Sequence, residues 1–180
     1  MPVPEPALPA TTVAESLPTA TLAAPEAPQL PTLSPPSLLI PVQGVSASDL
    51  RDTYYDRRDG GLRGHEAIDM GAPHGTPIFA VADGRIVKLF LSKPGGITIY
   101  QFDETERFTY YYSHLERYAD GLAEGQFVRR GAVIGYVGSS GNANPNAPHL
   151  HFAIFQLGPE KRWWKGEPIN PFTYLGGRKP

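Results

Sequence analysis

The sequence predicts an all-β fold, made mainly of antiparallel sheets with one or two short helices. Short segments rich in aromatic and β-branched residues follow one another between residues 77 and 156. Turn signals such as Asp83-Gly84 and Pro94-Gly95-Gly96 separate these segments. Since no long helical pattern lies between them, we expect neighbouring strands to pair antiparallel rather than to form β-α-β units.

The first 37 residues predict a linker or tail in front of the folded part. Residues 1–37 consist largely of Pro, Ala, Thr, Leu and Glu, without a lasting period of two or 3.6 residues. This composition is typical of an extended, polyproline-like linker or of a disordered tail. Such a linker either holds a domain at a distance from an anchor or has no function. We therefore expect one folded domain at residues 38–177.

The folded part begins with an apolar run and continues into a predicted short helix. One of the serines at its start can cap this helix, which would cover residues 46–52. Residues 57–64 are too rich in glycine and charge for a core element, so we expect a loop there. That loop leads directly into His65.

Six strands and one further helical turn are expected after this loop. The helical turn is predicted over residues 115–119. The strands are predicted over residues 77–82, 85–91, 97–102, 108–113, 132–137 and 150–156. Their close spacing leaves little room for helices, in agreement with an all-β domain.

Composition excludes several classes of function. The formal net charge is −2 and no basic run is present, so nothing indicates a nucleic-acid groove. No apolar stretch is long enough to span a bilayer, and the first residues lack the basic and apolar regions of a secretory signal. The chain has no cysteine, which rules out disulfides, cysteine metal ligands and thiol nucleophiles. Any metal must therefore be bound by histidine and carboxylate side chains.

Two histidines near the end of the chain lie on the last predicted strand. A single residue separates His149 from His151, so on a strand both imidazoles point to the same face, about 7 Å apart along the strand. Leu150, Phe152 and Ile154 would face the core and hold the two imidazoles rigid. One imidazole can then bind a metal while the other stands beside it.

Several motifs occur in an order that is similar to one enzyme family. They are His65-x-x-x-Asp69, Gly75-Thr76-Pro77-Ile78-Phe79-Ala80, Asp83-Gly84, Tyr112-Ser113-His114-Leu115, the run from Gly131 to Gly138, and Pro148-His149-Leu150-His151-Phe152. Together they resemble the lysostaphin/LytM-type zinc endopeptidases, over about residues 39–175. The resemblance implies a catalytic domain whose antiparallel sheets form an open groove.

The resemblance implies a role for each of five residues. His65, Asp69 and His151 would bind one zinc ion per chain, and His114 and His149 would be catalytic residues beside it. Two imidazoles and one carboxylate suit Zn²⁺, and three protein ligands leave the fourth tetrahedral position for water. The two free histidines would share the transfer of the water's proton and the stabilisation of the oxyanion.

Another interpretation places the first motif on a helix. In a thermolysin-like site, His65 and Asp69 would be ligands at i and i+4, and Glu66 would be the general base. Glycines flank the motif on both sides and a proline follows it, and such flanks disfavour a stable helix. We therefore expect no helix there and a Glu66 side chain that points to solvent.

Other conspicuous residues are expected to have structural roles. His74 fits no ligand spacing and is interpreted as an ordinary surface or packed residue. Residues 110–112 are three tyrosines, some of which must pack in the core because a strand alternates its faces. Trp163 and Trp164 either pin the C-terminal segment by apolar packing, the favoured interpretation, or form a groove wall for a peptide. The loop at residues 138–144 is expected to be flexible and to shape specificity.

The leading hypothesis is a zinc-dependent endopeptidase that hydrolyses peptide cross-links of bacterial peptidoglycan, as the resemblance implies. Its partners would be peptidoglycan peptide stems or cross-links, and not nucleic acid. It would act in the periplasm or after secretion, and an upstream anchor is compatible with this chain. Two alternatives stay open. One is a non-catalytic module that binds cell wall or activates another hydrolase, and the other is a zinc endopeptidase that acts on proteins.

Overall fold

The computed structural model describes residues 35–176 and confirms the all-β prediction. Its strands are β1 (Arg57–Arg58), β2 (Arg63–Gly64), β3 (Ile68–Gly71), β4 (Pro77–Phe79), β5 (Gly84–Ser92), β6 (Gly96–Asp103), β7 (Phe108–Tyr118), β8 (Phe127–Val128), β9 (Val133–Val137), β10 (His149–Leu157) and β11 (Gly166–Ile169). A short 3-10 turn, η1 (Asp59–Gly61), joins β1 to β2 and is the only helical element in the described part of the chain. Within those residues, no helix has the length and apolarity needed to cross a membrane.

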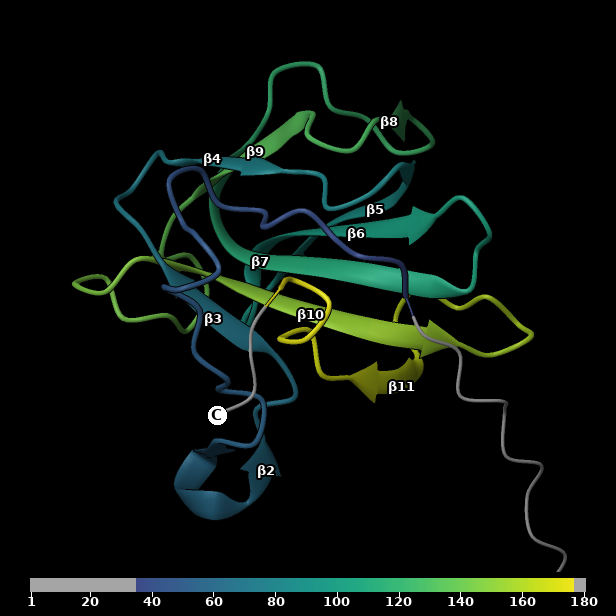
Figure 1. Ribbon diagram of the computed structural model, residues 1–180. Helices are drawn as coiled ribbons and strands as arrows, with labels where there is room; N and C mark the ends of the chain where they lie inside the picture. The colour runs from purple at the N-terminus through teal and green to yellow at the C-terminus, as the bar shows by residue number, and fades with distance from the viewer. Residues whose placement is uncertain (1–34, 177–180) are drawn as a thin grey trace, which may run out of the picture. The chain divides into compact units, whose positions relative to one another are not determined.

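The described strands pair antiparallel, and β10 occupies a central position among them (Figure 1). The main sheet has the order β11-β10-β7-β6-β5-β8, while β3 adds to β10 and β9 bridges β4 and β7. One edge of β10 pairs with β7, and its other edge pairs first with β3 and then with β11. Strand β10 therefore brings together segments that are far apart in the sequence.

The core lies on one face of the sheet and is formed by alternating residues of β10 and β7. Leu150, Phe152 and Ile154 are fully buried, as predicted for one face of the last strand. Tyr110 and Tyr112 are also fully buried, and both rings lie next to the ring of Phe152. Burial of one such side chain stabilises the fold by about 1.5–3 kcal/mol. The alternate residues of both strands are left for the opposite face.

All six predicted strands are present, as β4, β5, β6, β7, β9 and β10, but their ends differ from the prediction. Strand β4 ends at Phe79 instead of residue 82, and β7 runs on to Tyr118 instead of ending at residue 113. Strands β1, β2, β3, β8 and β11 have no counterpart in the sequence prediction. Each contains four residues or fewer, too short for an alternating pattern to be recognised.

Both predicted helices are wrong. Residues 46–52 contain only a turn, in which the Asp49 N–H donates to the Ser46 carbonyl at 3.1 Å and the Asp49 carboxylate accepts hydrogen bonds from Ser46. Residues 115–119 belong largely to β7, because this strand changes partner at Leu115 and pairs with β9 from there on. Non-local strand pairing thus overrides the local preference for a helical turn.

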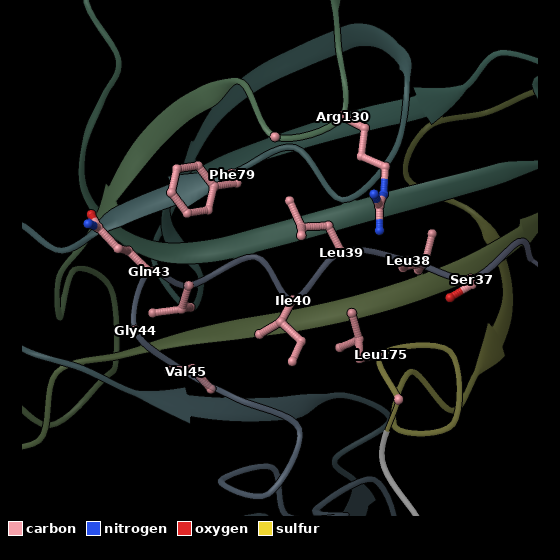
Figure 2. Close-up of a pocket in the computed structure, with 13 residues that line it drawn as sticks. Ser37, Leu38, Leu39, Ile40, Gln43, Gly44, Val45, Phe79, Arg130 and Leu175 are labelled. Atoms are coloured by element: carbon pink, nitrogen blue, oxygen red, sulfur yellow. The ribbon is translucent and has the colours of Figure 1, made fainter.

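The predicted linker lies, up to residue 34, outside the described residues, as does residue 177 at the predicted end of the domain. Where the described chain begins, the Leu38 N–H donates to the Tyr174 carbonyl at 2.8 Å. A hollow of about 540 Å³ lies at this segment. Figure 2 shows Ser37, Leu38, Leu39 and Ile40 lining it, together with Phe79 and Leu175. None of the five histidines lines this hollow, so it is separate from the histidine-bearing face.

Two buried tyrosines of β7 provide a matched test of hydrogen bonding in the core. The Tyr112 hydroxyl accepts from the Val81 N–H at 3.1 Å and donates to Gln101 Oε1 at 2.8 Å. The Tyr110 hydroxyl has no hydrogen-bond partner among the described residues. We expect Tyr112→Phe to lower the free energy of unfolding by about 1–3 kcal/mol, because Val81 and Gln101 lose a buried partner. Tyr110→Phe is the control and should leave it unchanged or slightly higher. Urea denaturation measures both variants, and equal losses would contradict this assignment.

Candidate metal centre

Three side chains from different parts of the chain converge on one point of the sheet face. The atoms are His65 Nε2, Asp69 Oδ1 and His151 Nδ1, and each lies 3.0 Å from the other two. His65 is buried, whereas Asp69 and His151 are partly buried and remain accessible from one side. Within residues 35–176 this is the group of histidine and carboxylate side chains that can hold a metal ion.

Strand pairing brings Asp69 and His151 together. Asp69 on β3 is the direct antiparallel partner of His151 on β10, so both side chains lie on the same face of the sheet. His65 lies in the segment just before β3, where its backbone N–H donates to the Asp56 carbonyl at 2.9 Å. The site therefore depends on a contact between residues that are 82 positions apart in the sequence.

Thr53 orients two of the three clustered side chains. Its carbonyl accepts a hydrogen bond from His65 Nδ1 at 2.9 Å, and its hydroxyl accepts one from the Asp69 backbone N–H at 3.2 Å. Because a carbonyl can only accept, His65 carries its proton on Nδ1 and presents a lone pair on Nε2 to the cluster. No motif in the sequence marks Thr53, since its contact with His65 uses a backbone atom.

Arg58 binds the outer oxygen of Asp69. Its Nη2 donates to Asp69 Oδ2 at 2.6 Å, which leaves Oδ1 facing the two histidines. Burial raises the pKa of Asp69, but hydrogen bonds with His151 and His65 outweigh burial and hold the pKa well below its ordinary value. Asp69 is therefore ionised. Sequence reasoning missed Arg58 because it placed residues 57–64 in a loop, whereas Arg58 lies on the short hairpin of β1 and β2.

The geometry of the cluster fits a small divalent ion. Bonds of about 2.0–2.1 Å in a tetrahedral arrangement place zinc ligands roughly 3.3 Å from one another. The observed 3.0 Å separations are close to that value. His65 Nε2 and Asp69 Oδ1 are both acceptors, and only a cation or a proton between them makes such a contact favourable. Two imidazoles and one carboxylate are also a ligand set that suits zinc.

The two other predicted site residues lie beside the cluster. His149 Nε2 is 3.9 Å from Asp69 Oδ1, farther than the three clustered atoms are from one another. The ring centroid of His114 is 5.0 Å from that of His149 and 5.7 Å from that of His151. The structure thus brings together all five residues that the sequence nominates, with three in close contact and two next to them.

Backbone carbonyls select the tautomer of both neighbouring histidines. His114 Nδ1 donates to the Ser140 carbonyl at 2.8 Å, and His149 Nδ1 donates to the Ala147 carbonyl at 2.9 Å. In the neutral form, each imidazole therefore has its lone pair on Nε2. This nitrogen is the atom through which either residue can accept a proton.

His114 occupies a β-bulge. The register between β6 and β7 shifts, so that Ile99 pairs with Tyr112 while Ile97 pairs with Leu115. His114 has a φ of +63°, which is uncommon for a residue other than glycine and stores strain of roughly 1–3 kcal/mol. Bulges change the direction of side chains next to functional sites. A strict alternation along β7 would not place His114 where it lies.

Ser140 fixes the loop that precedes β10. Its hydroxyl accepts from the Ile97 N–H at 3.0 Å and donates to the Leu115 carbonyl at 2.6 Å. The same residue supplies the carbonyl that holds His114. The sequence predicts a flexible loop over residues 138–144, but at Ser140 this loop is tied to both β6 and β7. Ser140 is therefore a positioning residue that sequence reasoning missed.

Two sequence-based interpretations of other residues agree with the structure. His74 is exposed and contacts Glu116 Oε2 at 3.5 Å and Ser139 Oγ at 3.3 Å, so it does not belong to the cluster. Glu66 is exposed and has a φ of +55°, and the residues around it are not helical. A helical, thermolysin-like arrangement of the first motif is therefore excluded.

Comparison with known proteins identifies the family. The sequence model described as Peptidase family M23 matches residues 63–171, which is more than half of the chain. The chain belongs to peptidase family M23. The match includes His65, Asp69, His114 and the histidine pair of β10, so the clustered residues all fall within the M23 region. M23 proteins are metallopeptidases, in agreement with a cluster that can hold a metal ion.

Individual M23 relatives are similar in sequence and in structure. The chain is 34% identical over 131 residues to L-Ala–D-Glu endopeptidase of Bacillus subtilis, covering 69% of this chain and 39% of that protein. It is 31% identical over 102 residues to peptidoglycan DD-endopeptidase ShyC of Vibrio cholerae, covering 57% of this chain and 22% of that protein. The catalytic domain of lysostaphin from Staphylococcus simulans matches with a TM-score of 0.59 at 27% identity, covering 71% of this chain and 92% of that domain. The chain thus spans well under half of the two sequence relatives.

A groove of about 230 Å³ lies over the M23 site. His114 and His151 line it from the sheet, and His65 lines it from the segment before β3. Tyr111 and Phe155 extend it along the sheet face. Pro94, Gly95 and Asn142 from two loops, together with Arg63, Glu66, Ser113 and Ala153, complete the lining. The groove therefore gives access to His65, His114 and His151.

Burial keeps two histidines of the M23 site, His114 and His151, neutral. Removal from water lowers the pKa of His114 to about 4, although the hydrogen bond to Ser140 acts in the opposite direction. Burial also lowers the pKa of His151, against the effect of Asp69. A neutral imidazole is the form that binds a metal ion or accepts a proton. Both residues therefore hold the required form at neutral pH.

The low pKa of His114 predicts a pH dependence of stability in the metal-free protein. Between pH 6.5 and about pH 4, His114 takes up a proton in the unfolded chain but not in the folded one. The stability present above pH 6.5 is therefore lost as the pH falls through this window, by at most about 1.4 kcal/mol per pH unit. We expect His114→Gln to show a shallower decline in urea denaturation series at several pH values. Parallel declines in both proteins would refute the buried, neutral state of His114.

Proposed function

We propose that this chain is a zinc-dependent endopeptidase that hydrolyses peptide cross-links of bacterial peptidoglycan. The single observation that carries the proposal is the cluster of His65 Nε2, Asp69 Oδ1 and His151 Nδ1, with mutual distances of 3.0 Å. The names of its M23 relatives supply the substrate class, since they include an L-Ala–D-Glu endopeptidase and a peptidoglycan DD-endopeptidase. His65, Asp69 and His151 would hold one zinc ion per chain.

The cluster and its neighbours divide the chemistry between them. When bound, zinc supplies a Lewis acid that makes a water molecule acidic enough to ionise near pH 7 and polarises the peptide carbonyl. His114 and His149 lie beside the cluster, and each has a free Nε2 because its Nδ1 donates to a backbone carbonyl. One Nε2 accepts the proton from the attacking water and passes it to the leaving nitrogen of the peptide bond. The other donates a hydrogen bond to the carbonyl oxygen that becomes negative, and this requires a proton on its Nε2 as well as on its Nδ1.

Contacts around the site hold His114 and Asp69 in fixed orientations. Ser140 holds His114 through its carbonyl, and the β-bulge directs the side chain of His114 toward His149. Arg58 donates a hydrogen bond to Asp69 Oδ2, so Oδ1 is the oxygen that faces the two clustered histidines. Catalytic groups held in this way need no reorganisation when substrate binds.

The proposal also covers the domain organisation, the location and the partners of the enzyme. Residues 38–177 would form the catalytic domain, and residues 1–37 would be the linker that precedes it. Because peptidoglycan lies outside the cytoplasm, the enzyme would act in the periplasm or after secretion. Its partners would be the peptide stems and cross-links of the wall.

Digestion of purified murein tests the proposed activity. We expect the zinc-loaded full chain to release soluble peptides, a strong chelator to abolish the release, and added zinc to restore it. Mass spectrometry of the released peptides identifies the bond that is cut. Casein serves as the comparison substrate for general proteolysis. Failure of the zinc-loaded protein to release peptides from several murein types would contradict the proposal.

Substitution of single histidines tests the separation of roles. We expect His151→Ala to lose bound zinc, because it removes one of the three clustered atoms. His149→Ala should keep its zinc but lose turnover by about a hundredfold or more, because it removes an acid-base group. His74→Ala, which changes an exposed histidine outside the cluster, should match the unchanged protein in both respects. Zinc content by atomic emission and murein turnover measure the two effects. Equal loss of zinc in His149→Ala and His151→Ala would mean that the roles are misassigned.

A further inference from the structure

A row of aromatic side chains extends from the cluster of His65, Asp69 and His151 along the same face of the sheet. Register places them there, because Ser113 is the cross-strand partner of His151 and Tyr111 is the partner of both Ala153 and Tyr100. Cross-strand partners share a face. The aromatic row, as the set is called below, consists of Phe90, Tyr100, Tyr111, Phe155, Trp163 and Trp164.

Four rings of the aromatic row, those of Tyr111, Tyr100, Trp163 and Trp164, follow one another in contact. The ring centroid of Tyr111 is 6.1 Å from His151 and 4.8 Å from Tyr100. Tyr100 is in turn 4.7 Å from Trp163, and Trp163 is 5.1 Å from Trp164. These distances lie in the range of aromatic pairs that stabilise each other. The row therefore forms a fixed floor that begins at a clustered histidine.

A second hollow lies over these rings, next to the groove at the His65-Asp69-His151 cluster. Its volume is about 240 Å³, and its lining consists of Tyr100, Tyr111, Phe155, Trp163, Trp164, Lys165 and Gly166. Tyr111 and Phe155 also line the groove over the cluster, so the two spaces lie side by side on the same face. A substrate that occupies the groove can therefore extend into the hollow without leaving the surface.

Packing explains Trp164 only in part, because its ring contacts Trp163 and lies 5.9 Å from the Arg162 guanidinium while most of the side chain stays open to solvent. Its side chain is 60% exposed, whereas Trp163 is half-buried between Tyr100, Phe90 and Trp164. Sequence reasoning favours apolar packing for both tryptophans, and only Trp163 behaves in this way. An exposed tryptophan at the rim of a hollow is a typical ligand contact.

We propose that the hollow at Trp164 is a second subsite that binds an N-acetylated hexosamine of the glycan strand to which the substrate peptide is attached. The proposal rests on the proposed function and names a further part of the same substrate. Aromatic faces are negative and attract the C–H-rich face of a sugar ring. Lys165 adds N–H donors for hydroxyl and acetamido oxygens. Among the described residues, no carboxylate lines the hollow, and Lys165 would repel the ammonium group of a diamino acid from a peptide stem.

Intrinsic fluorescence tests sugar binding without any need for catalysis. The chain's two tryptophans are Trp163 and Trp164, so tryptophan emission reports on this subsite alone. We expect a β-1,4-linked N-acetylglucosamine tetramer to change the emission of the full chain in a saturable way. Trp164→Ala should weaken this binding by about tenfold, which corresponds to about 1.4 kcal/mol, and still carries Trp163 as a reporter. Trp164→Phe should retain most of the affinity because it keeps an aromatic face.

Substrate comparison separates this inference from the proposed function. Trp164→Ala should lower kcat/KM on glycan-bearing murein fragments by about tenfold, mainly through KM, and leave kcat/KM on glycan-free stem peptides unchanged. Phe127→Ala is the matched control, because Phe127 is an exposed aromatic residue on β8, outside both hollows.

Each outcome of these measurements decides one question. A protein that cleaves neither kind of substrate refutes the proposed function, whatever the fluorescence shows. A protein that cleaves both, with equal loss for both in Trp164→Ala, refutes the sugar subsite and leaves the function intact. No change of emission up to the solubility limit of the sugar also refutes the subsite. A change produced by stem peptide alone would assign the hollow to the peptide instead.

Discussion

The register of β10 between β3 and β7 determines which side chains meet at the site. It places Asp69 opposite His151 on one side and Ser113 opposite His151 on the other. A shift of one residue would move every side chain of β10 to the opposite face. The buried face of this strand prevents such a shift, because Leu150 and Phe152 would then be exposed and the histidines buried. Core packing and metal-site geometry are thus two consequences of one pairing.

Backbone carbonyls orient three of the histidines that the strand register brings together. The carbonyls of Thr53, Ser140 and Ala147 each accept a hydrogen bond from a histidine Nδ1 and leave the corresponding Nε2 free. One of these histidines, His65, directs its free nitrogen into the cluster, while the others direct theirs to its edge. The loops that supply these carbonyls are held in turn, as the two hydrogen bonds of the Ser140 hydroxyl show. The chemistry of the site therefore depends on loops fixed to the sheet.

The parts of the fold that were predictable from sequence are those with a local signal. Strands such as β6 and β10 have alternating, β-branched or aromatic residues, and ligand candidates stand out by residue type and spacing. Strand β3 was missed because its four residues gain their strand character from pairing with β10. The prediction of a helical turn at residues 115–119 was wrong for a similar reason, because that segment pairs with β9 as part of β7. Arg58 and Thr53 act through contacts that only the folded chain creates, and no residue-type pattern identifies them.

A crystal structure of the zinc-soaked protein, measured at the zinc absorption edge, shows whether His65, Asp69 and His151 meet at one ion. We expect one strong anomalous peak per chain, bonded to Nε2 of His65, Oδ1 of Asp69 and Nδ1 of His151 at about 2.0–2.2 Å. His149 would lie nearby without a bond to the ion. A peak held by His149 in place of any of these three atoms, or a peak elsewhere on the chain, would rule out this three-residue site.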